Sequence, residues 1–473
     1  MNATNSVVTT TNDEPKKPKG LTRQQWFTLF VIGSVHFASA ICVSLQAPFY
    51  PQEAESKNVT SSEYGLVFGV YELTAFIASP VVGNYIDVIG AKTLLNSAVV
   101  VAGLSVIAFG LIGYIDSHGW FISLSFIIRI VEALGAASSV TAAFAITAAA
   151  FPDNVATTFA TLEIFYGMGY IAGPSIGGCL YSLGGYVPPF LVMGSALLLD
   201  GLVVYFVLPS FKRNDVESKG KFKELLKVPA VFIDAFSVMS ASICLGFYSA
   251  TLEPHIREFK LSPAILGLIF IINGTTYAAT APFVGMLCDR KFNPKVMILL
   301  GSIFMILSVF LVGPAPFFPF NETLPLVIVG LVLEGFGMSC IVVSAFIDAL
   351  RSSVAGGFPD DITTYGLMSG FWSASFSLGD FIGPSVAGVL NDWMGFRYGS
   401  LFIVIVHIAL FMTLSIYLLK HRKKAVYPIS TLPKNAIEEH INPCVILEEN
   451  YIKTNGVGYG TIEKKQEDCI SRF

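Results

Sequence analysis

Long apolar stretches alternate with short polar segments along most of this chain. A helix of about 20 apolar residues spans the hydrocarbon core of a bilayer, and a window of that length picks out twelve such stretches. They cover residues 26–49, 63–83, 93–114, 120–150, 155–183, 187–208, 229–252, 263–288, 295–313, 325–350, 363–390 and 398–419. Because a backbone inside lipid must satisfy its own hydrogen bonds, the pattern predicts an all-α membrane protein with twelve transmembrane helices.

The composition agrees with lipid as the solvent for these helices. Of the 473 residues, 53% are hydrophobic and 13% are charged, whereas a soluble domain carries about 25% charged residues. The net charge of −4 gives no reason to expect nucleic acid as a partner. The seven cysteines are scattered without metal-ligand spacing, and we find no nucleotide loop or nucleophile–base set. We therefore expect no metal, no cofactor and no enzymatic activity.

Basic residues set the expected orientation in the membrane. They gather in residues 1–25, 209–228 and 420–473, which an even number of spans places on one side. Lys and Arg concentrate on the cytoplasmic side, so both termini are expected in the cytoplasm. The glycosylation sequons at Asn58 and Asn321 fall on the opposite side, where modification takes place. Further sequons, at Asn2 on the cytoplasmic side and at Asn273 inside a span, are expected to stay unmodified.

Four short patterns occur twice, about 202 to 210 residues apart and in the same order. The pairs begin at Gly83 and Gly285, Glu132 and Glu334, Phe151 and Phe358, and Gly173 and Gly383. This duplication predicts two homologous six-helix halves. The expected divisions are a tail over 1–25, a first half over 26–208, a linker over 209–228, a second half over 229–419 and a disordered tail over 420–473.

Three of the motifs resemble those of a known superfamily of transporters. The run Gly83-x-x-x-Asp87-x-x-Gly90-x-Lys92 resembles the loop motif of the major facilitator superfamily. The run from Gly169 to Gly178, with Gly173 and Pro174 inside it, resembles that superfamily's antiporter motif, and Arg129 matches its buried-arginine motif. The resemblance covers about residues 24–420. It implies the major facilitator fold, with two pseudo-symmetric halves around one central cavity.

Within the superfamily, the chain resembles the vesicular amine transporters of the solute carrier 18 family. The likeness is carried by Gly65-Leu-Val-Phe-Gly69 through Ser79-Pro-Val-Val-Gly83 and by Phe151-Pro-Asp-Asn-Val-Ala156. The monoamine and acetylcholine members have a lysine where this chain has Tyr71, and aspartates where it has Cys340 and Ser373. The vesicular polyamine transporter branch also lacks that set, and the resemblance is closest to this branch.

Ionisable side chains inside the spans are the candidates for function, because placing one at the bilayer centre costs about 2.5–3.5 kcal/mol. The acids within the spans are Glu72, Glu132, Glu163, Asp200, Asp234, Glu334, Asp348 and Asp380. Arg129 is the single deep cation that we expect beside them. A cavity lined with carboxylates attracts small cationic substrates and protons. We therefore predict a proton-coupled antiporter of organic cations, with polyamines as the leading substrate.

Nine residues are assigned to substrate or proton binding: Glu132, Glu163, Glu334, Arg129, Asp380, Glu72, His36, Tyr71 and Tyr166. Arg129 and Glu132 lie three residues apart on one helix and are expected to pair; a permanently neutral packing pair is the alternative. His36 has a side chain that titrates near neutral pH, although a hydrogen-bonded core histidine is the alternative. Tyr71 and Tyr166 offer aromatic faces to ammonium groups, with simple packing as the alternative.

A second set of residues is assigned to gating: Gly83, Asp87, Gly90, Lys92, Asp289, Gly169, Gly173, Pro174, Gly177, Gly178, Gly383 and Pro384. The glycines allow helix backbones to approach closely, and Pro174 bends its helix. Asp87 and Asp289 are expected to pair with basic groups when the cytoplasmic side closes, with loop capping as the alternative.

The expected location is a secretory or synaptic-type vesicle membrane, with the plasma membrane as the alternative. Tyr459-Gly-Thr-Ile462 resembles a tyrosine-based sorting signal, so adaptor proteins are expected partners of the C-terminal tail. The chain is expected to act as a monomer. Two rival functions stay open: a plasma-membrane exporter of drugs or organic cations, and a non-transporting sensor on the same fold.

Overall fold

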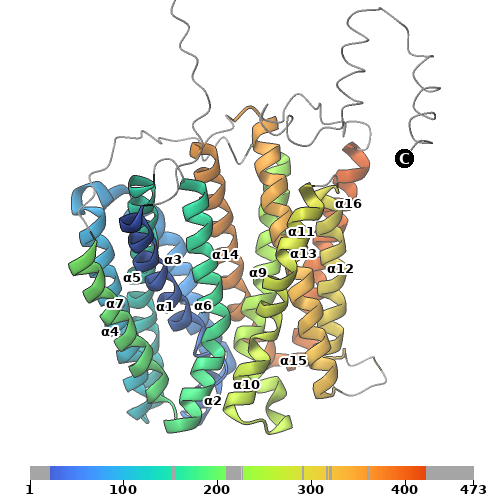
Figure 1. The fold of residues 1–473 in the computed structure, drawn as a ribbon. Coiled ribbons are helices and arrows are strands. Elements are labelled where there is room, and N and C mark those ends of the chain that lie inside the picture. Colours follow the sequence, from blue (N-terminus) through green and yellow to red (C-terminus); the bar gives the residue numbers. More distant parts are fainter. Residues whose placement is uncertain are drawn as a thin grey trace, which may run out of the picture. The chain divides into compact units, whose positions relative to one another are not determined.

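A computed structural model describes residues 22–151, 155–208, 225, 227–289, 292–315, 318, 322–358 and 362–421 (Figure 1). Within these residues every regular element is a helix. Residues up to Ile416 form one compact unit, and the packing discussed below lies inside it. Asn321 and the sorting-like signal near Tyr459 lie outside the described residues, as does most of the 209–228 linker.

We call the helices before the linker the N-terminal half and those after it the C-terminal half. The N-terminal half contains α1 (Arg23–Ser44), α2 (Tyr50–Ser56), α3 (Ser61–Ile89), α4 (Ala91–Leu111), α5 (His118–Ala150), α6 (Val155–Gly184) and α7 (Val187–Val207). The C-terminal half contains α9 (Pro229–Ile256), α10 (Pro263–Phe270), α11 (Ile272–Asp289), α12 (Pro294–Val312), α13 (Leu324–Ala355), α14 (Ile362–Met394), α15 (Phe396–Gly399) and α16 (Leu401–His421). Two separate apolar clusters form the interior, one almost wholly from each half.

The helices begin where the sequence supplies capping residues. Thr22 and Thr60 each open a helix with a capping box, in which the threonine and the Gln or Glu three residues later satisfy each other's backbone. Asn293 caps α12 by accepting a hydrogen bond from the backbone of Lys295. Gly90 separates α3 from α4 at a φ of +85°, a conformation that favours glycine. The loop motif thus contains a turn that needs a glycine at this position.

Each of the twelve predicted spans corresponds to helical structure, but the first one, predicted over 26–49, ends at Ser44 and is followed by turns over 45–49, and two others are interrupted. The eighth span breaks at Ile271, where the side chain of Asn273 accepts a hydrogen bond from the backbone of Gly274 at 2.6 Å and competes with the helix. The twelfth span breaks at Ser400 into α15 and α16. Continuous helices were predicted at both places, so these two boundaries were wrong.

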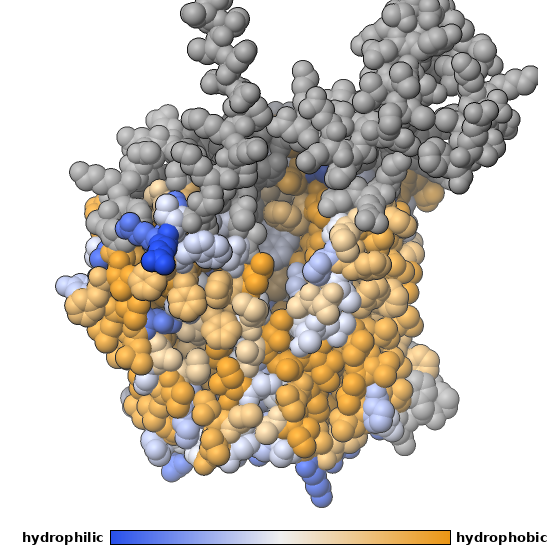
Figure 2. Space-filling view, in the orientation of Figure 1, coloured by the Kyte–Doolittle hydropathy of each residue, from blue (hydrophilic) through white to orange (hydrophobic). Residues whose placement is uncertain are grey.

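Among the described residues, nine spans are long and apolar enough to cross a membrane. The other three predicted spans are α3, α6 and α14, with 29, 30 and 33 residues. These three helices take a large part in the contact between the halves. Large apolar side chains face outward over the flanks (Figure 2), as lipid-facing helices require.

The halves touch where α3 meets α14 and where α6 meets α10. Glycines line both contacts, so that backbone packs directly on backbone. A Cβ added to Gly65 would strike the carbonyl of Pro384, and one added to Gly178 would strike the carbonyl of Pro263. One added to Gly388 would strike the backbone of Ser61. Such contacts need residues without side chains on one partner.

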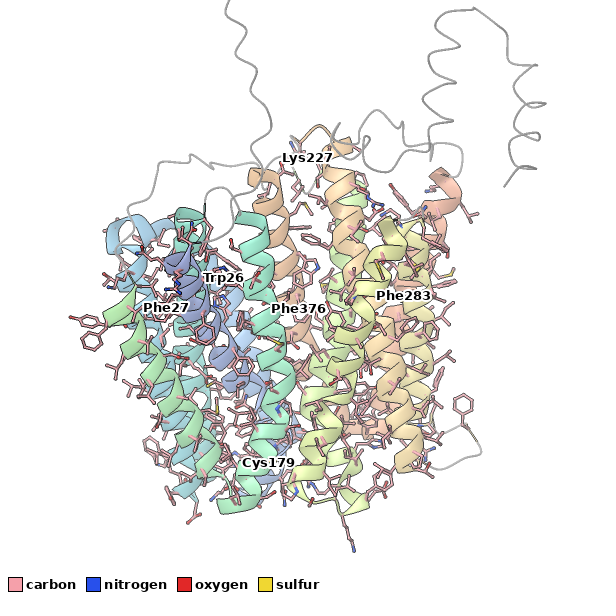
Figure 3. All side chains as sticks on the ribbon, viewed as in Figure 1. Trp26, Phe27, Cys179, Lys227, Phe283 and Phe376 are labelled. Atoms are coloured by element: carbon pink, nitrogen blue, oxygen red, sulfur yellow. The ribbon has the colours of Figure 1, made fainter. Side chains whose placement is uncertain are left out.

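Polar bonds join the halves at one end of the bundle. Cys179 lies at this end and Lys227 at the opposite end, where the linker enters α9 (Figure 3); we call them the Cys179 end and the linker end. At the Cys179 end, Asp392 of α14 accepts hydrogen bonds from the backbone N–H groups of Ser61 and Ser62 at 3.0 and 2.7 Å. A carboxylate at the start of α3 also compensates the partial positive charge of that helix end.

An ion pair strengthens the same end. Arg257, just after α9, pairs with Glu55 of α2 across the halves and with Glu253 of its own half at 2.7 Å. Together with the glycine contacts, these bonds close the Cys179 end in this structure.

We predict that filling the interhelix contact separates the halves and lowers stability. Gly388→Leu places a side chain against the backbone of α3, and overpacking of this kind costs about 1–3 kcal/mol. Thermal unfolding of the purified protein in detergent should show a midpoint several degrees lower. Gly370→Leu is the matched control, because a Cβ on Gly370 of the same helix meets nothing within 4 Å. Equal midpoints for the two variants would contradict the proposed contact.

Candidate substrate and proton site

Two carboxylates from opposite halves lie within electrostatic range of each other where α3 packs against α14. Glu72 of α3 hydrogen-bonds to Ser377 of α14 and interacts electrostatically with Asp380 of α14. Asp380 is buried, and its Oδ1 lies against Gly246 of α9, where no Cβ would fit. Chain folding therefore unites two predicted site residues that lie about 300 residues apart in the sequence.

Aromatic side chains of α6 lie beside this acid pair. The rings of Tyr166 and Tyr170 stack with centroids 6.4 Å apart. Both tyrosines lie close enough to Glu72 and Asp380 to interact electrostatically with them. Tyr166 was predicted at the site, whereas Tyr170 was not. The combination of carboxylates and aromatic faces is the chemistry that binds ammonium groups.

Glu163 faces the same region from one turn earlier in α6. Its side chain is exposed, yet it interacts electrostatically with Tyr277 of α11 in the other half. Its closeness to Tyr277 places this carboxylate towards the opposite half, and Tyr166 also interacts with Glu163, Glu72 and Asp380. The structure therefore brings Glu163 into the same region as Glu72 and Asp380.

Arg129 and Glu132 form the predicted ion pair within the N-terminal half. Arg129 Nη1 lies 2.8 Å from Glu132 Oε2, and both side chains are almost fully buried. The guanidinium also lies 4.2 Å from the centroid of the Tyr71 ring, a cation–π contact. Beside the pair is a cavity of about 10 Å³ lined in part by Cys42 and Ser39, which holds no more than about one water molecule. The face of the Tyr71 ring is thus already in contact with a cation of the protein itself, Arg129.

Glu334, the repeat partner of Glu132, has different surroundings. Its side chain is fully buried, Oε1 accepts a hydrogen bond from Cys244 Sγ at 3.7 Å, and Asn273 lies beside it. The position that corresponds to Arg129 holds Leu331. Glu334 therefore sits among uncharged neighbours in its described contacts.

His36 makes its contacts apart from the acids. Its Nδ1 bonds to the backbone oxygen of Ile32 at 3.1 Å, and its ring centroid lies 6.0 Å from that of Phe144. These contacts stay within the N-terminal half. The prediction that His36 binds substrate or protons has no contact here that supports it.

Most of the residues assigned to gating pack helices against each other. Gly169, Gly173 and Gly177 lie against the backbone or side chains of α1, and Gly383 lies against α9. Pro174 lies inside α6, and its carbonyl faces Gly267 of α10 in the other half. Gly178 and Pro384 also lie in the contacts between the halves. Lys92 has its Nζ 6.0 Å from the Tyr205 ring. The side chains of Asp87 and Asp289 lie outside the described part of the structure, as does the packing around Gly83.

Lys295 is a second deep cation that the sequence reasoning missed. Its side chain is only 4% exposed, and Nζ lies 3.1 Å from Asp234 and 2.6 Å from Asp348. The expectation that Arg129 is the single deep cation was therefore wrong. Lys295 is the second residue of α12, and a lysine at a helix start is ordinarily solvated. Its spacing from the two aspartates in the sequence gives no sign of the contact.

One titratable group near the Cys179 end lies outside the spans. Glu322 precedes α13, and its Oε2 is 3.1 Å from His255 Nε2. Burial and the neighbouring Glu258 carboxylate raise the pKa of Glu322 to about 7. This corner of the protein therefore changes charge close to neutral pH.

Comparisons with known proteins agree with this architecture. The family model of the Major Facilitator Superfamily matches residues 32–254 and 235–443. The MFS-type transporter SLC18B1 of Mus musculus is 35% identical over 382 residues, covering 80% of this chain and 83% of that protein. The Homo sapiens protein of that name is 35% identical over 386 residues, covering 81% and 84%. The synaptic vesicular amine transporter of Rattus norvegicus is 24% identical over 381 residues, covering 79% and 69%.

Solved structures share the fold at low sequence identity. An inward-facing and occupied bacterial homolog of the human lysosomal transporter Spinster superposes with a TM-score of 0.68 at 12% identity, covering 85% of this chain and 99% of that one. The nucleoside transporter NupG gives 0.64 at 12% identity, covering 84% and 99%. These similarities confirm the predicted major facilitator fold.

We predict that breaking the Arg129–Glu132 pair harms the protein more than replacing it. Glu132→Gln leaves the buried guanidinium without its carboxylate, and removing one partner of a buried pair costs about 3–5 kcal/mol. The midpoint of thermal unfolding in detergent should fall clearly. The double variant Arg129→Met/Glu132→Leu should melt closer to the wild type, because apolar replacement of a whole buried pair is often neutral. A double variant that melts below the single one would contradict this.

Proposed function

The chain belongs to the major facilitator superfamily, in the group of the MFS-type transporter SLC18B1, and on this premise we propose that it exchanges protons for organic cations, with polyamines as the leading substrate. It is a multi-pass membrane transporter. The observation that carries the proposal is the meeting of Glu72 and Asp380 across the two halves, beside Tyr166 and Tyr170. Synaptic vesicular amine transporters among the relatives support a vesicle membrane as the location.

The acids around the centre select for positive charge. Glu163 joins the central pair, and Glu334 lies in the same half as Asp380 without a charged neighbour among its described contacts. Carboxylates spread over several helices suit a substrate that carries several amines along an extended chain. Each ammonium group then finds its own carboxylate, and the methylene segments between the amines pack against the tyrosine rings.

The two central carboxylates, Glu72 and Asp380, also give a physical reason for the exchange of protons for organic cations. Two carboxylates that share a buried site cannot both keep their charge without compensation, so one of them holds a proton or a bound cation. A proton and an ammonium group compete for the same oxygens, and only one of them occupies the site at a time. Competition for one site is the simplest physical basis of antiport.

Occupancy of the pair acts on both halves because each half contributes one carboxylate. Charge repulsion between Glu72 and Asp380 pushes α3 from α14, whereas a bound cation draws these helices together. Alternating access requires the glycine contacts and the Arg257–Glu55 pair at the Cys179 end to open. The central charge and the closure of the Cys179 end are thereby linked through α3 and α14.

We expect wild-type protein in proteoliposomes with an acidic interior to accumulate labelled spermidine. Asp380→Asn should lower gradient-driven uptake by roughly ten- to a hundredfold, as loss of one charge-assisted hydrogen bond of about 1.5–3 kcal/mol implies. Asp200→Asn is the matched control, because Asp200 bonds to Ser34 within the N-terminal half, away from the central pair.

Absence of gradient-driven uptake of spermidine, of monoamines and of other organic cations by the wild type would refute the proposed function. A transporter with a different substrate would take up one of the other cations. A non-transporting sensor would take up none of them. Glu72 and Asp380 would then be dispensable for its function.

We also propose that the linker end is cytoplasmic, which glycosylation tests. Asn58 is exposed at the Cys179 end, in the turn after α2. Protein expressed in mammalian cells should shift to lower mass on treatment with a glycosidase that removes N-linked glycans, and Asn58→Gln should lose part or all of that shift. Asn2→Gln should leave it unchanged. A shift that depends on Asn2 would reverse the orientation.

A further inference from the structure

Three charged side chains meet inside the C-terminal half, well away from the central pair. Asp234 of α9, Lys295 of α12 and Asp348 of α13 are 1%, 4% and 1% exposed. Lys295 Nζ lies 3.1 Å from Asp234 Oδ1 and 2.6 Å from Asp348 Oδ2. We call these three residues the buried triad. Asp234 lies 12 residues before Gly246, the contact of Asp380, so the triad is about 18 Å from the central pair along α9.

The triad carries one more negative charge than positive when all three groups are ionised. Asp234 Oδ2 is buried without a hydrogen-bond partner among the described residues, and the carboxyl of Asp348 lies close enough to bond with that of Asp234. A buried charge without compensation is strongly unfavourable. One proton bound at Asp234 Oδ2 makes the cluster neutral.

The described neighbours of the triad contribute polar and apolar contacts. Arg351, about one turn beyond Asp348, directs its guanidinium to the backbone oxygen of Cys288 on α11, and the Cys288 thiol bonds to Ser344. On α14 the neighbouring residues are Met368 and Phe371, packed with Leu225, Val231 and Ala349. Ser352 adds a hydroxyl bond to Asp348 Oδ2 at 3.3 Å. On α14, Asp380 belongs to the central pair and Asp392 lies at the Cys179 end; Glu334 is the other acid of α13.

The N-terminal half shows that the fold does not need these charges. Gly169 packs on Phe37 as Gly379 packs on Met239, which sets the register between α1 and α9. Asp234 then corresponds to Ile32, which is fully buried.

The other two positions follow from the same symmetry. Gly135 faces Ala98 as Gly337 faces Gly301, so Asp348 corresponds to Ile146 and Lys295 to Lys92. Ile146 is fully buried, and Lys92 is partly exposed. The same three-helix corner thus has two buried isoleucines and a partly exposed lysine in one half, and two buried aspartates and a buried lysine in the other. Because burying charge costs stability where isoleucine suffices, the triad calls for a role beyond packing.

We propose that the buried triad is a second proton-binding site, in which Asp234 Oδ2 binds one proton beside Lys295 and exchanges it with solvent at the linker end. Binding takes the cluster from one net negative charge to none. The inference rests on the proposed proton coupling and deepens it. The central pair binds the organic cation. The triad binds a proton that the organic cation does not displace.

Two variants test the site from opposite directions. Asp234→Asn keeps the shape of the carboxyl but cannot release a proton. The triple variant Asp234→Ile/Lys295→Met/Asp348→Ile takes the two isoleucines of the N-terminal half and removes the lysine charge with them, and such replacements of buried ion clusters are often neutral for stability. Asp200→Asn is the control for removing a half-buried acid elsewhere.

Each protein is reconstituted and measured twice with labelled spermidine. Counterflow into vesicles preloaded with unlabelled spermidine, at equal pH on both sides, measures transport itself. Accumulation under an inside-acid gradient measures coupling to protons. Both variants should keep counterflow within about twofold of the wild type and lose gradient-driven accumulation by about tenfold or more, a change of about 1.4 kcal/mol or more in coupling.

A spectroscopic measurement detects the proton directly. Infrared difference spectra across a pH jump should contain a carboxyl C=O band in the wild type that both variants lack and the control keeps. Folded variants with wild-type accumulation and an unchanged C=O band would overturn the inference alone. A wild type that performs counterflow without responding to the gradient would overturn the proposed proton coupling, and a wild type without counterflow would overturn the proposed substrate.

Discussion

An ionised side chain inside this bundle must find its counter-charge within the protein, because lipid and packed apolar side chains do not solvate it. The interior meets this requirement in different ways. Arg129 and Glu132 neutralise each other and add the Tyr71 ring. Glu334 has no charged partner among its described contacts. Glu72 and Asp380 set two like charges together. The degree of compensation separates groups that stabilise the fold from groups that remain available to protons and cations.

The contact between the halves obeys a second constraint that works together with the first. Backbone packs on backbone wherever Gly65, Gly178 and Gly388 stand opposite the other half. Such contacts are close but contain few interlocking side chains, so the halves separate without disrupting an apolar core. The apolar clusters remain inside each half. The bundle therefore has two stable bodies joined by a contact that polar bonds and central charge can open or close.

Much of this arrangement could be predicted from the sequence because it depends on local patterns. Hydropathy located the helices, and the three-residue spacing of Arg129 and Glu132 predicted their pair. The break at Ile271 was missed, because the Asn273 side chain competes with the helix in a way that hydropathy does not register. The meeting of Glu72 with Asp380 is a long-range consequence of folding, and no local spacing contains it.

Departures from the internal symmetry are the most informative feature of the chain, because both halves fold on one plan. The position of Tyr71, which stacks on Arg129, corresponds to Asn273, which lies beside Glu334. The repeat thus keeps an acid in each half but supplies a cation only in the first. At the linker end the additional charge lies in the second half instead: Asp234 stands where the first half has Ile32. Shared packing explains what is equal between the halves. The unequal charges have no such explanation, and this makes them the residues whose replacement tests the proposed transport most directly.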